Sequence, residues 1–306
     1  MLTYFQHQKF LNKGLYVSGL MLKGDNLIDV FRKTAEDLSK DLMRVESVVG
    51  IIFHGGLTRG YADRFSDIDI DVIIEKEDND VRESIYGIAS RHSRRTGLDI
   101  DLSVLSLRHF LEKEFDDSAK WDYSRAIVRY DPKGIIQKIL TEKIAIRREE
   151  LVKRIVENSL YLQWYCCPVN EEELSISEAW ISRGDLVSAH YALNHSIELM
   201  LNLLYALNRR HTPPAKWRVF YSYKLPWKPK MYEKLLKDAL RVEDFSYEDL
   251  KRRLSALRKL ADDIMHKAEV ETGIRVEDFL KYYVTNILKI RNIPFSKADS
   301  HQRITT

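Results

Sequence analysis

The first half of the chain switches between helical and strand periodicity. Apolar residues that recur every three or four positions predict amphipathic helices, and short β-branched or alternating runs predict strands. The predicted elements are a helix from Asn26 capped by Asp25, strands at 48–53 and 67–74, a helix at 78–95 that begins at Asp78 or Asn79, and a strand at 98–105. This order predicts a small mixed sheet with helices on one face.

The second half reads differently, because strand periodicity nearly disappears after Pro132. The most apolar segment, 185–208, predicts a helix that starts at Asp185 and is stopped before Pro213. Further helical patterns cover 135–166, 230–240, 247–270 and 276–290. We therefore expect an α+β domain over residues 1–138, an all-α helical bundle over 139–295 and a flexible tail over 296–306.

Composition narrows the class of protein. The chain has 306 residues, of which 44% are hydrophobic and 31% charged, so it can build a packed core and is not a disordered chain. A net charge of +3 is too small to indicate general nucleic-acid binding. Without a signal-peptide pattern or a long apolar run, we expect a cytoplasmic protein with no membrane partner. The adjacent Cys166 and Cys167 are expected to be idle thiols.

Glycine is scarce but clustered. Only 12 glycines occur, and four of them, Gly50, Gly55, Gly56 and Gly60, fall within one short stretch. Around Gly55 and Gly56 the sequence reads His-Gly-Gly-Leu-Thr-Arg-Gly, and paired glycines allow backbone N–H groups to approach an anion. Thr58 and Arg59 add a hydroxyl and a guanidinium. This loop is therefore a candidate phosphate site.

Two of the predicted strands carry aspartates at alternate positions. Asp67, Asp69 and Asp71 share one face of the first, and Asp99 and Asp101 share one face of the second. If the strands are neighbours, the carboxylates converge and need a cation, for which Mg²⁺ is the natural choice. A solvated polar face is the alternative, but five aspartates without a lysine favour the metal.

The glycine loop followed by Ser66-Asp67-Ile68-Asp69 resembles the signature of the DNA polymerase beta-type nucleotidyltransferase superfamily. The resemblance covers about residues 26–134 and is similar to that of minimal and antibiotic-modifying (kanamycin-type) members, which have a C-terminal helical domain. A third acidic residue completes the family pattern. Asp101 matches it best, with Asp99 as the alternative, and the sequence does not separate the two.

The resemblance implies a metal-dependent reaction. Asp67 and Asp69 would bind Mg²⁺ and the triphosphate, and Asp101 would bind a second ion or act as general base. The residues implied in binding ATP, or another nucleoside triphosphate, are Gly55, Gly56, Thr58, Arg59 and Ser66. A nucleoside monophosphate, most simply AMP, would pass to a hydroxyl of a small-molecule or macromolecular acceptor, with release of pyrophosphate. The resemblance also allows a homodimer.

The helical half is less specific. By the same resemblance, Asn208, Arg209, Lys216 and Trp217 are candidates for acceptor or nucleotide contact, with a helix end and simple packing as the alternative. Glu178 and Glu198 are candidate bases, although structural roles are more common for such residues.

Two other functions stay open. Arg183 and His190 loosely fit the spacing of helical ribonuclease toxins, so a toxin–antitoxin-type protein that modifies a protein or RNA is one alternative. A catalytically inactive nucleotide-binding module is the other, and the presence of all three aspartates argues against it.

Overall fold

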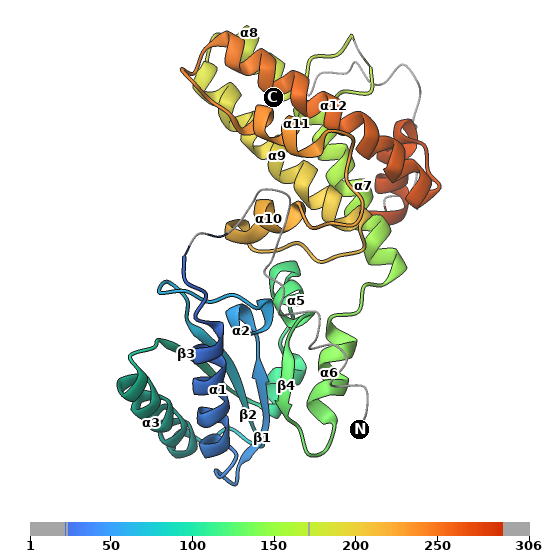
Figure 1. The fold of residues 1–306 in the computed structure, drawn as a ribbon. Coiled ribbons are helices and arrows are strands. Elements are labelled where there is room, and N and C mark those ends of the chain that lie inside the picture. Colours follow the sequence, from blue (N-terminus) through green and yellow to red (C-terminus); the bar gives the residue numbers. More distant parts are fainter. Residues whose placement is uncertain (1–21, 23, 171, 290–306) are drawn as a thin grey trace. The chain divides into compact units, whose positions relative to one another are not determined.

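The computed structural model describes residues 22, 24–170 and 172–289, and it divides into two compact units between Ala145 and Ile146 (Figure 1). The domain boundary predicted after residue 138 falls inside helix α6 (Ile135–Lys143), which belongs to the first unit. The tail predicted over 296–306 lies outside the described residues.

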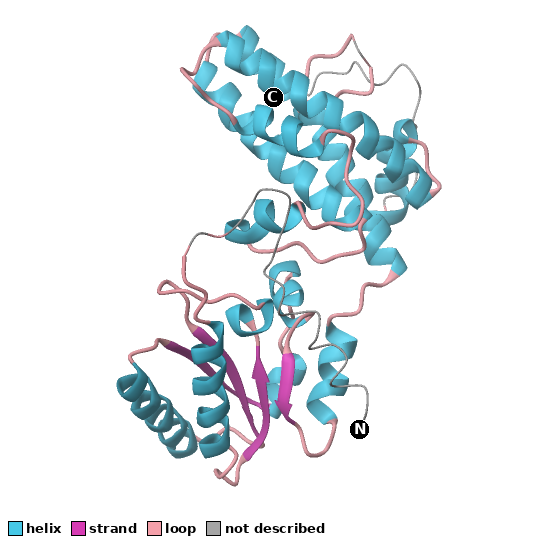
Figure 2. Cartoon of the chain, in the orientation of Figure 1, coloured by secondary structure: helices cyan, strands magenta, loops and turns pink. Residues whose placement is uncertain are grey.

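The first unit is built on a sheet of four strands (Figure 2). They are β1 (Val48–Phe53), β2 (Ile68–Ile74), β3 (Ile100–Ser106) and β4 (Ile127–Tyr130), in the spatial order β3-β2-β1-β4. β2 and β3 run parallel, whereas β1 pairs antiparallel with both β2 and β4. The first three strands were predicted; β4 was missed because four residues show too little alternation.

Helices accompany these strands. They are α1 (Ile28–Leu42), α2 (Gly55–Arg59), α3 (Asn79–Thr96), α4 (Leu107–Glu112), α5 (Asp117–Tyr123) and α6. Asp78 caps α3 as predicted, accepting a hydrogen bond from the Val81 N–H at 3.1 Å. The Asp25 cap is wrong: the Asn26 side chain instead accepts from the Ile28 N–H at 3.2 Å, near the start of α1. The glycine stretch predicted as a loop forms α2.

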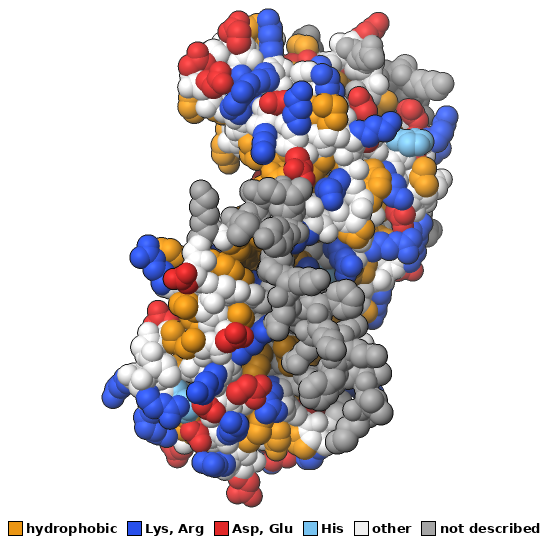
Figure 3. Space-filling view, in the orientation of Figure 1, with side chains coloured by type: hydrophobic (Ala, Val, Ile, Leu, Met, Phe, Trp, Pro, Cys, Tyr) orange, Lys and Arg blue, Asp and Glu red, His pale blue; other side chains and the backbone are white. Residues whose placement is uncertain are grey.

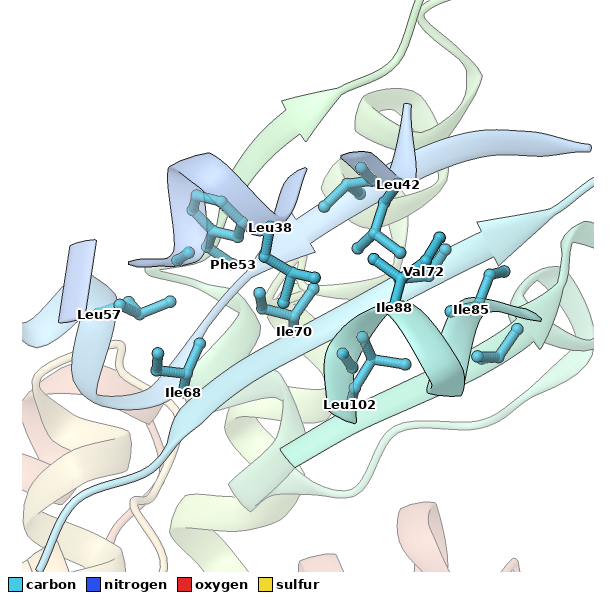
Figure 4. Close-up of a cluster of buried hydrophobic side chains, with 14 of the residues drawn as sticks. Leu38, Leu42, Phe53, Leu57, Ile68, Ile70, Val72, Ile85, Ile88 and Leu102 are labelled. Atoms are coloured by element: carbon cyan, nitrogen blue, oxygen red, sulfur yellow. The ribbon is translucent and has the colours of Figure 1, made fainter. Parts of the chain in front are cut away.

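The sheet is covered on both faces. Ile68, Ile70 and Val72 point into a buried cluster with α1 and α3 (Figure 4). Ile52 and Ile73, on the opposite face, join a second cluster that includes Phe110 of α4, Tyr123 of α5, and Ile136, Ile139 and Leu140 of α6. The helices predicted on one face of the sheet are α1 and α3. Helices α4 to α6 cover the other face, which the sequence did not predict.

The second unit is helical throughout its regular structure. Its helices are α7 (Arg148–Tyr165), α8 (Ile176–Ser182), α9 (Leu186–Leu207), α10 (Ala215–Ser222), α11 (Tyr232–Leu240), α12 (Tyr247–Thr272) and α13 (Phe279–Tyr282), with a 3₁₀ turn at Val276–Asp278 and a π turn at Tyr283–Ile287. The apolar α9 packs against α7, α8 and α12 and begins behind Asp185, as predicted. The helical stretch predicted over 135–166 consists of two helices, α6 and α7. The α+β and then all-α fold class is confirmed.

The surface agrees with the composition. On the face shown in Figure 3, basic and acidic side chains are interspersed over each unit, as expected from a net charge of +3. Cys166 and Cys167 are free thiols. No helix in the described part of the chain combines the length and apolarity that a membrane span requires.

Candidate active site

Three carboxylates meet at one end of the parallel strand pair. Asp67 precedes β2, Asp69 lies in β2, and Asp101 faces Asp69 in the register of β3. One carboxylate oxygen from each residue lies within 4.8 Å of the others. We call these three residues the acidic cluster. Asp99, the alternative third acid, stands just before β3 and is outside the cluster. Geometry therefore groups Asp101, which the sequence left open, with the Asp67–Asp69 pair.

The charges of the acidic cluster are poorly neutralised by the protein. Burial of the Asp69 carboxyl raises its pKa, and the neighbouring Asp67 charge raises it further, against the opposing effects of His54, the Gly56 N–H and Arg59. A divalent cation would remove this repulsion, and hard carboxylate oxygens are the ligands that Mg²⁺ prefers. The residues present therefore fit a divalent ion.

The glycine pair lies against the acidic cluster. Gly55 has a φ of +57°, and a Cβ atom at this position would stand 1.6 Å from the Asp69 Oδ2. The next N–H, that of Gly56, donates to the same oxygen at 3.3 Å. A Cβ on Gly56 would meet nothing nearer than the Tyr61 carbonyl oxygen at 3.5 Å. Gly55 is thus required for the close approach of Asp69, a reason that the sequence did not reveal.

The other three predicted nucleotide-binding side chains have protein partners. The Thr58 hydroxyl donates to the Gly55 carbonyl at 3.1 Å, within α2. The Arg59 guanidinium lies 2.7 Å from Asp122 and so ties α2 to α5. The Ser66 hydroxyl donates to Asp63 at 3.1 Å and orders the turn that leads to Asp67. Thr58 and Arg59 therefore lie in α2, and Ser66 lies in the turn before Asp67. Their contact with a nucleotide stays a prediction.

A buried polar network lies further along the same face of β2. Asp71 is 4% exposed and accepts a short hydrogen bond from the Tyr123 hydroxyl. The His54 Nε2 lies 3.5 Å from the same carboxylate. Burial alone would lower the pKa of His54, but the Asp71 hydrogen bond and charge raise it above its usual value. Burial and the Asp71 charge also raise the pKa of Tyr123, so its hydroxyl remains a donor. Asp71 is therefore a buried structural residue next to the site and is not part of the acidic cluster.

Replacing Tyr123 with phenylalanine is expected to loosen β2. The change leaves the buried Asp71 carboxylate short of a donor, at a cost of about 1–3 kcal/mol. Hydrogen exchange of the peptide that covers β2 should accelerate, whereas Tyr86→Phe, at an exposed position on α3, should leave it unchanged. Equal exchange in the wild type and Tyr123→Phe would show that the network does not support the strand.

The first unit is also recognisable in its sequence. Residues 31–162 match the family model of the nucleotidyltransferase domain. Over these residues the chain therefore matches a nucleotidyltransferase domain. The resemblance to the polymerase beta-type superfamily that the glycine loop and the aspartate pair predicted is thereby confirmed, and these two motifs lie inside the matched residues.

Solved structures give weaker likenesses. A nucleotidyltransferase-like protein from Exiguobacterium sibiricum 255-15 is 13% identical, with 88% of this chain and 82% of that chain covered and a TM-score of 0.40. A chain from a complex of a tri-AMPylated Shewanella oneidensis HEPN toxin with the MNT antitoxin is 15% identical. The match covers 44% of this chain and 99% of that chain, with a TM-score of 0.27. At such TM-scores these likenesses assign no activity or partner to this chain. No curated protein matches its sequence.

Outside the nucleotidyltransferase domain, several predicted site residues have structural partners. The Asn208 side chain bonds to the backbone of Leu204 and Trp227 at the end of α9. Arg209 pairs with Glu271 at 2.6 Å, and Glu198 pairs with Arg218. These three residues therefore have partners within the helical unit, and their contact with an acceptor or nucleotide stays a prediction.

The remaining candidates in this unit divide between its core and its surface. Trp217 packs beside the rings of Phe220 and Tyr221, and Lys216 is exposed on α10. His190 is 2% exposed, and its Nδ1 lies 2.6 Å from Arg253. Arg183 instead stacks over the Trp180 ring at 4.7 Å. His190 therefore occupies the position of a core histidine.

Glu178 completes a capping box at the start of α8. Its carboxylate accepts from the Ser175 N–H at 3.0 Å and pairs with Arg258 at 2.7 Å. Burial acts to raise the pKa of Glu178, but the Ser175 and Arg258 contacts outweigh it and lower the pKa below the ordinary 4.5. A carboxyl group with a lowered pKa stabilises the fold at every pH above its ordinary pKa. The stabilisation is lost as the pH falls through the lowered pKa.

Glu178→Gln is accordingly expected to destabilise the protein in a pH-dependent way. At pH 7 the free energy of unfolding should fall by about 0.5–1 kcal/mol, because glutamine can keep the capping hydrogen bond but loses the charge that pairs with Arg258. Urea unfolding of both proteins from pH 7 downward measures the difference, which should shrink once the pH passes below 4.5. A difference that stays constant to pH 3 would contradict this role.

Proposed function

We propose that this chain transfers a nucleoside monophosphate from a nucleoside triphosphate, with ATP as the donor, to a hydroxyl group of an acceptor, and releases pyrophosphate. The observation that carries the proposal is the acidic cluster beside Gly55, with its three carboxylate oxygens within 4.8 Å of one another inside a nucleotidyltransferase domain. A solvated polar face would not require one aspartate to press into the space that a neighbouring Cβ would fill.

The proposal gives each residue of the acidic cluster a task. Asp67, Asp69 and Asp101 would hold Mg²⁺, which when bound neutralises the charge on phosphate and on the entering oxygen. Asp69 is half-buried and fixed by the Gly56 N–H, so it is suited to a rigid ligand role. Asp101 is exposed and can accept the proton of the acceptor hydroxyl.

The segment from Gly55 to Ser66 would then contact the nucleotide, with the triphosphate at Gly55 and Gly56. Its paired glycines present backbone without side chains, so phosphate oxygens can come close to N–H groups. Thr58, Arg59 and Ser66 lie on this same segment and are the proposed polar contacts to the nucleotide. Catalysis of this kind depends mainly on positioning and charge neutralisation, which these residues provide without a covalent step.

The test is release of pyrophosphate from ATP by the purified full chain, supplied with Mg²⁺ and a fractionated cell extract as the source of acceptors. We expect release that stops when EDTA is added and returns with excess Mg²⁺. The absence of release with all four nucleoside triphosphates, or release insensitive to EDTA, would contradict the proposal.

A further inference from the structure

A cavity of about 530 Å³ opens directly beside the acidic cluster. Its wall includes Asp67 and Asp101 of the cluster, together with Asp99, Ser66, Arg64 and Phe65. Neither Gly55 nor Asp69 lines it. The cavity therefore adjoins two of the proposed metal-binding carboxylates and does not include the glycine pair. Its volume is in the range of small-molecule sites.

The most unusual feature of the cavity wall is Phe65. This side chain is 81% exposed, the largest value among the exposed large hydrophobic residues of the described chain. The backbone that carries it is held in a turn, because its N–H donates to the Asp63 carboxylate at 2.9 Å and the Ser66 hydroxyl donates to the same carboxylate. The Arg64 guanidinium lies over the ring at 4.5 Å. An anchored turn thus presents a flat aromatic ring, backed by a cation, at the cavity wall.

The charges of the lining limit what can occupy the cavity. Three carboxylates, those of Asp67, Asp99 and Asp101, face one guanidinium, that of Arg64. Asp67 and Asp101 are the proposed Mg²⁺ ligands, and the charges of Asp99 and Arg64 balance, so the rest of the wall offers no net positive charge to a polyphosphate. An uncharged flat ring would stack on Phe65 and meet hydrogen-bond acceptors at its edge. Every nucleoside triphosphate brings such a ring, joined through its ribose to the α-phosphate.

We propose that this cavity is the nucleobase subsite and that the base of the nucleoside triphosphate stacks on Phe65, an inference that rests on the proposed function. The triphosphate runs from the acidic cluster toward Gly55 and Gly56, and the nucleoside runs the opposite way into the cavity. Phe65 is a binding residue in this arrangement: it adds affinity for the nucleoside and none for the phosphates.

The test separates base from phosphate by using two ligands. Calorimetric titration in the presence of Mg²⁺ compares α,β-methylene-ATP, which has a base, with inorganic tripolyphosphate, which has none. Loss of one stacked base weakens binding by about tenfold or more. Phe65→Ala should therefore lower the affinity for the ATP analogue by about tenfold. Its affinity for tripolyphosphate should stay within about twofold of that of the wild type. Phe65→Trp should restore analogue binding, because it restores an aromatic face.

A matched control is available on the same unit. Leu111 of α4 is 56% exposed and lies outside the cavity lining, so Leu111→Ala should change neither affinity. If the wild type binds the ATP analogue and Phe65→Ala binds it equally well, the base lies elsewhere and the proposal is wrong. An equal loss for both ligands would also overturn it, since Phe65 would then act on the phosphate site. If the wild type binds neither ligand, the proposed function itself fails.

Discussion

Asp101→Asn is expected to reduce Mg²⁺-dependent pyrophosphate release by about a thousandfold while the protein stays folded. Asparagine keeps the shape of the side chain but removes the charge that holds a cation and accepts a proton. Loss of several kcal/mol of charge stabilisation in the transition state corresponds to a rate loss of this size. Initial rates at saturating ATP, with circular dichroism as the check on folding, measure the effect.

The matched variant is Asp99→Asn, which removes a charge two residues away on the same segment. Asp99 lies outside the acidic cluster and lines only the neighbouring cavity. Its replacement should therefore lower the rate of pyrophosphate release by about tenfold at most. Equal losses in both variants would contradict the assignment of Asp101 as the third acid. Glu83→Gln, on the exposed side of α3, should leave the rate unchanged.

Gly55→Ala is the second change with a large expected effect. An alanine Cβ would stand 1.6 Å from the Asp69 Oδ2, and the φ of +57° disfavours any side chain. The Asp69 carboxylate must move away, which breaks its contact with the Gly56 N–H and disperses the acidic cluster. We expect a loss of about a hundredfold or more in pyrophosphate release, because a shift of about 1 Å at a reacting group has this effect. The left-handed backbone adds about 1–3 kcal/mol of destabilisation.

Gly56→Ala provides the control at the neighbouring position. Here the nearest atom to the new Cβ is a carbonyl oxygen at 3.5 Å, an ordinary contact, and no strained φ is involved. This variant should keep its thermal stability and the position of Asp69, and it should lose less activity than Gly55→Ala, because its methyl group affects only the approach of phosphate. A Gly56→Ala protein as inactive as Gly55→Ala would show that freedom from side chains, and not the approach of Asp69, explains the glycine pair.

Local patterns in the sequence predicted much of this site. The alternation of aspartate and aliphatic residues identifies β2 and β3, and their parallel pairing brings Asp69 opposite Asp101. Asp78 and Asp185 mark the starts of α3 and α9, because capping depends only on nearby backbone groups. These features are decided within a few residues of the chain, so a single sequence suffices to find them.

Features that depend on distant residues were not predictable in this way. The network of Asp71, His54 and Tyr123 joins positions up to 69 residues apart, and α5, which carries Tyr123, has no strong periodicity. The break between α6 and α7, at residues 144–147, contains neither glycine nor proline, so the local sequence does not predict it. The choice between Asp99 and Asp101 required the register of β2 against β3, which is a property of the folded sheet.

In the proposed function, the acidic cluster supports the transfer of a nucleotidyl group from ATP to an acceptor. The most direct measurement follows the fate of labelled phosphate in parallel reactions with α-labelled and γ-labelled ATP, Mg²⁺ and extract-derived acceptors. We expect α-label in the acceptor and γ-label in pyrophosphate, in equal amounts, with both signals lost in Asp69→Asn. Release of γ-label as orthophosphate, its appearance in the acceptor, or undiminished transfer by Asp69→Asn would contradict the proposed function.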